Sequence, residues 1–99
     1  EKRFIMSEEI RASHILVQTE EEAQNLKEMI EAGEKDFETV AAQCSLCPSG
    51  ANGGDLGYFP KGVMVKSFED AAFSLEKGKL SDPVKTSFGW HLILVTDKK

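Results

Sequence analysis

The stretch PVKTSFGWHLILV, residues 83–95, decides the fold because it contains two extended segments joined by a turn. Residues 90–95 form the most apolar strand candidate in the chain, and residues 83–85 form a shorter one. Gly89 supplies the turn signal between them. Strands with so short a connection pair antiparallel, so we expect a mainly antiparallel sheet.

A further strand is predicted near the start of the chain. Residues 10–17, IRASHILV, form a short and mostly apolar run, which is typical of a largely buried strand. Side chains alternate along a strand, so one face would carry Ala12, His14 and Leu16, and the other Ser13, Ile15 and Val17. We therefore expect His14 to point into a packed layer.

Two helices are predicted after this strand. Thr19 followed by Glu22 has the spacing of a capping box, and apolar residues recur at helical spacing until Gly33. Asp36 is the predicted N-cap of the second helix, whose apolar stripe ends at Cys44. Cys44 is thus most simply a core residue.

The middle of the chain is predicted to turn back and form a strand and a third helix. Proline, glycine and asparagine are dense over residues 48–54, which predicts a loop, and residues 55–59 form a short strand candidate. Ser67 is the predicted cap of the third helix, and Gly78 is predicted to end that helix. The expected fold is α+β, in the order βααβαββ, with a four-stranded, mainly antiparallel sheet flanked by helices.

Composition limits the classes of partner. The 99 residues are 40% hydrophobic and 29% charged, as in one ordinary globular domain. We expect residues 1–9 to be a linker or a cloning remnant and residues 10–99 to be the domain. The net charge of −5 argues against nucleic acid, and no apolar stretch is long enough to span a bilayer. We expect a monomer without membrane contact.

Cys44 and Cys47 form a C-x-x-C pair that permits three interpretations. A redox pair usually lies at a helix N-terminus, whereas these cysteines lie at the end of the second predicted helix. With His14 and His91 they match a zinc ligand set in number but not in spacing. The third interpretation is that all four are ordinary core or surface residues.

Five blocks of the sequence, in order, resemble one family. They are RASHILV, DFETVA, CSLCPSGANGGDLGYF, MVKSFEDAAFSL and PVKTSFGWHLILVTD. Together they resemble the parvulin family of peptidyl-prolyl cis/trans isomerases over residues 10–97. The resemblance implies the βααβαββ fold, isomerase activity on proline-containing chains, and neither a cofactor nor a metal.

The resemblance also implies roles for particular residues. His14 and His91 resemble the paired histidines of the family, and Cys47 resembles the residue beside the susceptible peptide bond. Thr86 and Ser45 resemble the polar residues linked to the histidine pair. The walls of the proline pocket would be formed by Leu56, Met64, Phe68 and Phe88, with Phe59 adjoining. On this view the C-x-x-C spacing is accidental.

The mechanism implied is non-covalent. Rotation about an X-Pro bond faces a barrier of about 18–20 kcal/mol because the C–N bond has partial double-bond character. An apolar pocket would favour the twisted amide over the planar one, so no nucleophilic role for Cys47 is needed. Where phosphate-directed parvulins carry a basic cluster, this chain has Glu20, Glu21 and Glu22. We therefore expect no preference for phosphorylated substrates.

The start of the sequence and the two cysteines bear on the parent protein and its location. Residues 1–16 resemble the segment that precedes parvulin domains in exported multidomain bacterial foldases. This favours a periplasmic or other extracytoplasmic location and unfolded, proline-containing polypeptides as clients. The two cysteines favour the cytoplasm as the alternative. The alternative function is a catalytically weak peptide-binding chaperone module with the same fold.

Overall fold

The structure is a computed structural model, in which residues 8–99 are described. Most of the linker predicted for residues 1–9 lies outside the described residues. Strand β1 begins at Glu9, one residue before the predicted start of the domain.

The elements follow the predicted βααβαββ order, with a 3-10 helix added. They are β1 (Glu9–Val17), α1 (Glu20–Glu31), α2 (Phe37–Cys44), η2 (Pro48–Asn52), β2 (Asp55–Pro60), α3 (Lys66–Ser74), β3 (Val84–Thr86) and β4 (Gly89–Lys98). An irregular loop was predicted for residues 48–54, and this was wrong, because Pro48–Asn52 form the 3-10 helix η2. Proline is favoured in the first turn of a helix, and Pro48 begins η2.

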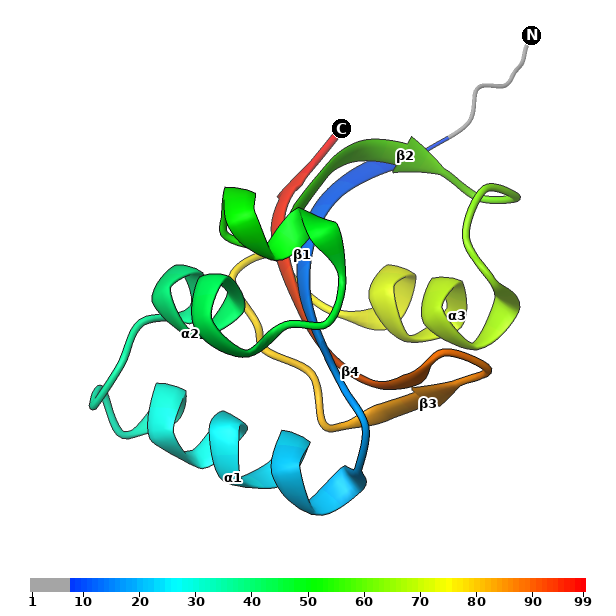
Figure 1. Ribbon diagram of the computed structural model, residues 1–99. Coiled ribbons are helices and arrows are strands. Elements are labelled where there is room, and N and C mark those ends of the chain that lie inside the picture. Colours follow the sequence, from blue (N-terminus) through cyan, green and yellow to red (C-terminus); the bar gives the residue numbers. More distant parts are fainter. Residues whose placement is uncertain (1–7) are drawn as a thin grey trace, which may run out of the picture.

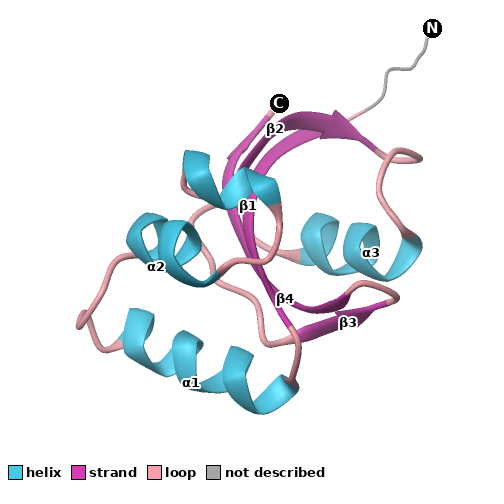
Figure 2. Ribbon diagram, in the orientation of Figure 1, coloured by secondary structure: helices cyan, strands magenta, loops and turns pink. Residues whose placement is uncertain are grey.

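The four strands form one antiparallel sheet in the order β2-β1-β4-β3 (Figure 2). Strands β1 and β4, the first and the last strands within residues 8–99, are the central pair. In their register Leu16 lies opposite His91, and His14 lies opposite Ile93. His14 and His91 are therefore diagonal neighbours on the same face of the sheet.

Two of the three predicted helix caps are confirmed. The Thr19 side chain accepts a hydrogen bond from the backbone N–H of Glu22 at 3.1 Å, and Asp36 accepts one from Thr39 at 2.9 Å. These bonds satisfy N–H groups that the first turn of a helix leaves free. In residues 8–99, no helix has the length and apolar character needed to cross a bilayer.

The prediction for the third helix was wrong at both ends. Ser67 lies inside α3, because the chain is already helical from Lys66 and the N-cap is Val65, which makes no side-chain capping bond. The helix ends at Ser74, four residues before Gly78. Gly78 has φ = 86° and lies in the turn that follows.

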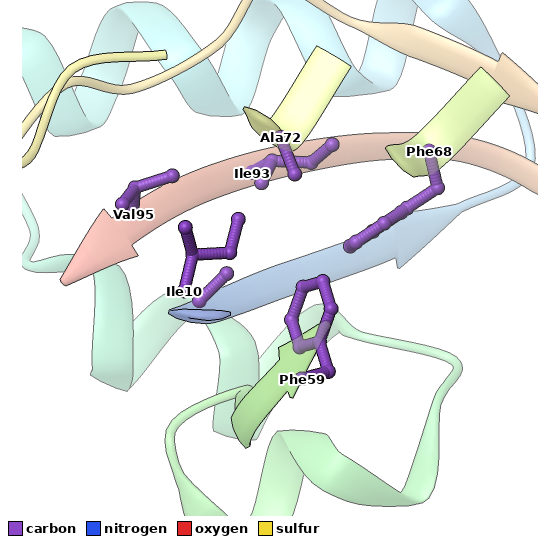
Figure 3. Packing of buried hydrophobic residues seen from close by; sticks show 7 residues of the cluster. Ile10, Phe59, Phe68, Ala72, Ile93 and Val95 are labelled. Carbon is purple, nitrogen blue, oxygen red and sulfur yellow. The ribbon is translucent and has the colours of Figure 1, made fainter. Parts of the chain in front are cut away.

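Each face of the sheet packs against its own helices (Figure 1). Helix α3 covers one face, where the buried cluster consists of Ile10, Ala12, Phe59, Phe68, Ala72, Ile93 and Val95 (Figure 3). Helices α1 and α2 cover the other, with Ile15, Val17, Ala23, Phe37, Val40, Ala41 and Leu92. Alternation along β1 and β4 supplies both clusters, and the face under α3 also carries the two histidines.

Candidate functional site

Two buried histidines meet at the centre of the sheet. The Nδ1 atoms of His14, on β1, and His91, on β4, lie 2.9 Å apart, and the side chains are only 6% and 4% exposed. This confirms that His14 points into a packed layer. Their diagonal placement brings the two rings together within hydrogen-bond distance.

The pair continues into β3 through Thr86. The Thr86 Oγ1 atom lies 2.7 Å from His91 Nε2 and accepts a hydrogen bond of 3.1 Å from the backbone N–H of Phe88. If the Thr86 hydroxyl donates to His91 Nε2, then His91 Nδ1–H donates to His14 Nδ1. Only His14 Nε2–H then lacks a partner among residues 8–99. The opposite tautomers would leave the hydroxyl hydrogen without an acceptor as well, so the first arrangement satisfies more groups.

Burial keeps both rings neutral at pH 7. It lowers the pKa of His14 below its ordinary value, because the positive form loses hydration in the packed layer. Burial, together with repulsion from a charged His14, lowers the pKa of His91 to about 4. The pair thus forms a polar but uncharged floor.

Phe68 holds both histidine rings from the side of α3. Its ring meets His14 edge-on at a centroid distance of 5.5 Å and His91 at 5.2 Å. Such perpendicular arrangements suit the charge distribution of aromatic rings. Phe68 is 3% exposed and also belongs to the core cluster under α3, so the site and the core share a wall.

A hollow of about 520 Å³ opens above the pair. The sequence-predicted residues that line it are His14, Cys47, Leu56, Met64, Phe68, Phe88 and His91. The volume is within the range of small-molecule sites. No residue that lines it, within the described part of the chain, is Asp, Glu, Lys or Arg. The hollow is therefore suited to an apolar group such as a proline ring.

Two of the predicted site residues neither line the hollow nor bond to the histidine pair. Phe59 is 3% exposed and packs in the core against Phe68 and Phe73, so it supports the wall without lining the hollow. Ser45 is not bonded to a histidine. Its hydroxyl oxygen accepts from the backbone N–H groups of Leu16 and Cys47, which fixes the segment beside the site.

The two cysteines lie in different surroundings. Cys44 packs against the core under α1 and α2, as its helical stripe predicted. Cys47 lines the hollow and accepts a hydrogen bond of 3.2 Å from the Ser49 hydroxyl. In the described residues, no three His, Cys, Asp or Glu side chains gather as a metal-ligand set.

Sequence reasoning missed part of the lining. Leu16, Leu46, Pro48, Val63 and Val65 also face the hollow. Leu16 shares the predicted strand face with His14, so alternation contained a signal for it. The others lie in loops or at the start of η2, where no periodic pattern indicates which way a side chain points.

Comparison with known proteins identifies the family. Residues 6–97 match the rotamase family, described as the PPIC-type PPIASE domain. The foldase protein PrsA of Geobacillus sp. (strain WCH70) is 56% identical over 91 residues, which cover 91% of this chain and 33% of that protein. The crystal structure of peptidylprolyl isomerase (PrsA) from Bacillus anthracis superimposes with a TM-score of 0.91 at 47% identity, covering 94% of this chain and 43% of that one.

A smaller relative matches along its whole length. The solution structure of NmPin, the parvuline of Nitrosopumilus maritimus, has a TM-score of 0.81 and 45% identity, and covers 93% of this chain and 99% of that one. By contrast, the chain spans about a third of the length of the curated foldases it matches. The chain belongs to the parvulin, or PPIC-type, family and is a peptidyl-prolyl cis/trans isomerase domain.

Proposed function

We propose that the hollow above His14 and His91 is where the X-Pro bond rotates, and that the reaction is non-covalent. The observation that carries this proposal is an apolar cavity built on a neutral, hydrogen-bonded histidine pair. The proline ring lies among Leu56, Met64 and Phe68, which exclude water from the amide. The planar amide is the more charge-separated state, so removing water raises its free energy relative to the twisted state.

The side chains around the bond then have distinct tasks. The histidine pair fixes the shape of the floor, with Thr86 holding His91 from β3. Cys47 adjusts the electrostatic environment of the bond without attacking it. No general base is hydrogen-bonded to the Cys47 sulfur among residues 8–99, and its partner is the Ser49 hydroxyl.

A pair of matched variants tests the location of the site. Met64 lines the hollow, whereas Met29 lies in α1 outside it, and both are half-buried. We expect Met64→Glu to lower kcat/KM by at least about 100-fold, because a carboxylate would be desolvated by the bound proline ring. Met29→Glu should retain normal activity. Equal activity of the two variants, both folded by circular dichroism, would contradict the proposed site.

The substrates that we propose carry no phosphate. The histidines are neutral, no cationic side chain lines the hollow within the described chain, and Glu20, Glu21 and Glu22 are exposed at the start of α1. None of these groups carries the positive charge that would bind a phosphate. Peptides with phospho-Ser and unmodified Ser before proline should be compared. A large rate gain with the phosphorylated peptide would refute this part of the proposal.

The domain acts on proline-containing polypeptides. We propose that these clients are unfolded or extended segments, since the edge of the hollow is reachable from solvent, with Leu46 56% and Phe88 68% exposed. The domain should accelerate the proline-limited refolding of a denatured protein. It should leave the X-Pro bonds of the same protein in its native state unaffected, and equal action on both would contradict the proposal.

A further inference from the structure

A β-bulge interrupts strand β2 beside the hollow. The ladder between β1 and β2 shifts by one residue between its Arg11 and Ser13 positions. As a result, Leu56 and Gly57 of β2 together face a single residue of β1. A bulge bends its strand and changes the direction in which the following side chains point. Because Leu56 lines the hollow, this bulge lies at the wall of the proposed site.

The bulge turns Leu56 toward the hollow. Phe59 packs into the core cluster under α3 (Figure 3), and Leu56 packs against the same cluster. In a regular strand, residues three positions apart point to opposite faces of the sheet. The extra residue in β2 cancels this alternation, so both side chains lie on the face that carries the histidine pair. In an unbroken strand, Leu56 would point away from the hollow.

Asp55 is bonded to both sides of the bulge. Arg11 Nε donates to Asp55 Oδ1 at 3.1 Å, and Arg11 Nη2 donates to Asp55 Oδ2 at 2.5 Å. The same Oδ1 atom accepts the N–H of Gly57 at 3.0 Å. The hydrogen bond from Arg11 also lowers the pKa of the Asp55 carboxyl below its ordinary value, so the group is ionised at neutral pH. The carboxylate therefore joins the residue after Leu56 to the residue before it, and both to β1.

We propose that Asp55 is a positioning residue for the isomerase reaction: together with Arg11, it holds the bulge that directs Leu56 toward the bound proline. This inference rests on the proposed function, in which Leu56 is a wall of the proline pocket. A bidentate arginine–carboxylate pair fixes direction as well as distance. The other ion pairs within residues 8–99 are made by lysine, whose ammonium group imposes no such geometry.

The exposure of the ion pair favours a role in placing Leu56 over a role in overall stability. The side chains of Arg11 and Asp55 are 46% and 26% exposed. Ion pairs that are this open to solvent usually contribute little to the free energy of unfolding. A small displacement of a group that contacts the substrate, by contrast, can lower the rate strongly. Loss of the pair should therefore affect catalysis more than unfolding.

A double-mutant cycle between Asp55 and Leu56 tests this inference through kcat/KM for a short X-Pro peptide. We expect Leu56→Ala to lower kcat/KM by about tenfold and Asp55→Ala to lower it by about fivefold. Because Asp55 acts through Leu56, the double variant should lose only about tenfold, whereas independent effects would multiply to about fiftyfold. A loss near fiftyfold, or normal activity of Asp55→Ala, would overturn the inference.

Two further variants separate positioning from folding. Asp55→Asn keeps an oxygen that can accept the Gly57 N–H, so it should lose less activity than Asp55→Ala. Glu31→Ala breaks the ion pair between Lys27 and Glu31 on α1, outside the hollow, and should keep the wild-type kcat/KM. Far-UV circular dichroism checks that each variant is folded. If Asp55→Ala does not fold, Asp55→Asn takes its place in the cycle, with the same expectation that its loss disappears in the Leu56→Ala background.

The outcomes distinguish this inference from the proposed function. An equal loss in Glu31→Ala and Asp55→Ala would show that any broken surface ion pair has this effect, and would overturn the inference while leaving the site intact. Full activity of folded Leu56→Ala would instead contradict the proposed function, because the wall of the hollow would then have no contact with the substrate. The inference would be lost with it.

Discussion

His14 and His91 share a 2.9 Å contact between their Nδ1 atoms although 77 positions separate them in the chain. The contact exists because β1 and β4 pair in a register that makes the two residues diagonal neighbours. A slip of one residue in β1 would turn His14 to the opposite face of the sheet. The interactions that fix this register therefore also hold the proposed site together.

Thr86 is predicted to act through its hydroxyl group. Thr86→Val keeps the shape of the side chain but removes its hydroxyl group. This hydroxyl is the common hydrogen-bond partner of His91 Nε2 and the Phe88 N–H. Leaving buried polar groups unpaired costs about 1–3 kcal/mol of unfolding free energy, measured with urea. We expect kcat/KM to fall by about tenfold. Thr86→Ser, which keeps the hydroxyl, should remain near wild type, and similar losses in both variants would contradict the role.

The histidine pair predicts a particular dependence on pH. The pKa of His91 is about 4 in the folded state, and an unfolded histidine has a value of about 6.5. The unfolded state therefore binds more protons between these values, so stability is complete above pH 6.5 and falls as the pH is lowered toward 4. The total loss is of order 3 kcal/mol, measurable by urea unfolding at each pH.

Activity should follow the folded-state pKa and not the unfolded value. The kcat/KM of the domain should be constant from pH 8 to pH 7 and should fall only below pH 6.5, because burial lowers the pKa of both histidines below their ordinary value. At lower pH, protonation of the pair would put a hydrogen on both Nδ1 atoms. Two N–H donors would then face each other across the contact between the rings. An activity profile with its midpoint near 6.5 in the folded domain would show that the pair titrates as exposed histidines do.

Cys47→Asp is predicted to retain substantial isomerase activity. A non-covalent mechanism needs a polar group beside the bond but no nucleophile, so the loss should stay below about tenfold. Removing a true nucleophile costs several orders of magnitude. The measurement is cis-to-trans relaxation of a short X-Pro peptide, for which the uncatalysed reaction takes about 10–100 s at 25 °C. Complete inactivity of a folded variant would revive a covalent role for the thiol.

Gly54 is predicted to tolerate no side chain because it lies against the backbone of β1 at His14. A Cβ atom at Gly54 would lie 2.4 Å from the carbonyl oxygen of His14, and its own carbonyl accepts the His14 N–H at 2.9 Å. Gly54→Ala should destabilise the domain by at least about 3 kcal/mol, as measured by urea unfolding.

Gly57 provides the matched control for this substitution. It also has a positive φ, of 73°, but a Cβ atom there would meet no atom within 4 Å. Gly57→Ala should cost only about 1–2 kcal/mol, the price of the left-handed conformation. Equal losses in the two variants would mean that the close approach to His14 contributes nothing.

Local interactions made most of the fold predictable. The Thr19 and Asp36 caps each join residues three positions apart, so they can be read directly from the sequence. The third helix was harder to place, because Val65 begins it without a side-chain bond and the serine that resembles a cap lies inside. Where the backbone alone starts a helix, the sequence carries no capping signal.

The site was predictable to the extent that it lies on regular elements. His14 and His91 follow from alternation on two strands together with the family resemblance. The position of Leu46 depends on a backbone bond to Leu16, 30 positions earlier, and the bonds of Ser45 likewise depend on the tertiary fold. Loop conformations of this kind are fixed by contacts distant in sequence, so residue patterns do not show them.

The pairing of β1 with β4 has a consequence for the order in which this activity appears. A chain delivered from its N-terminus, by a ribosome or through a secretion channel, presents β1 long before its partner. Loop closure over so many residues is slow compared with local helix formation. A nascent domain that lacks β4 has neither His91 nor a central strand to pair with β1. The proposed site is therefore complete only when β4 has been delivered, and a chain that is interrupted before β4 is predicted to be inactive.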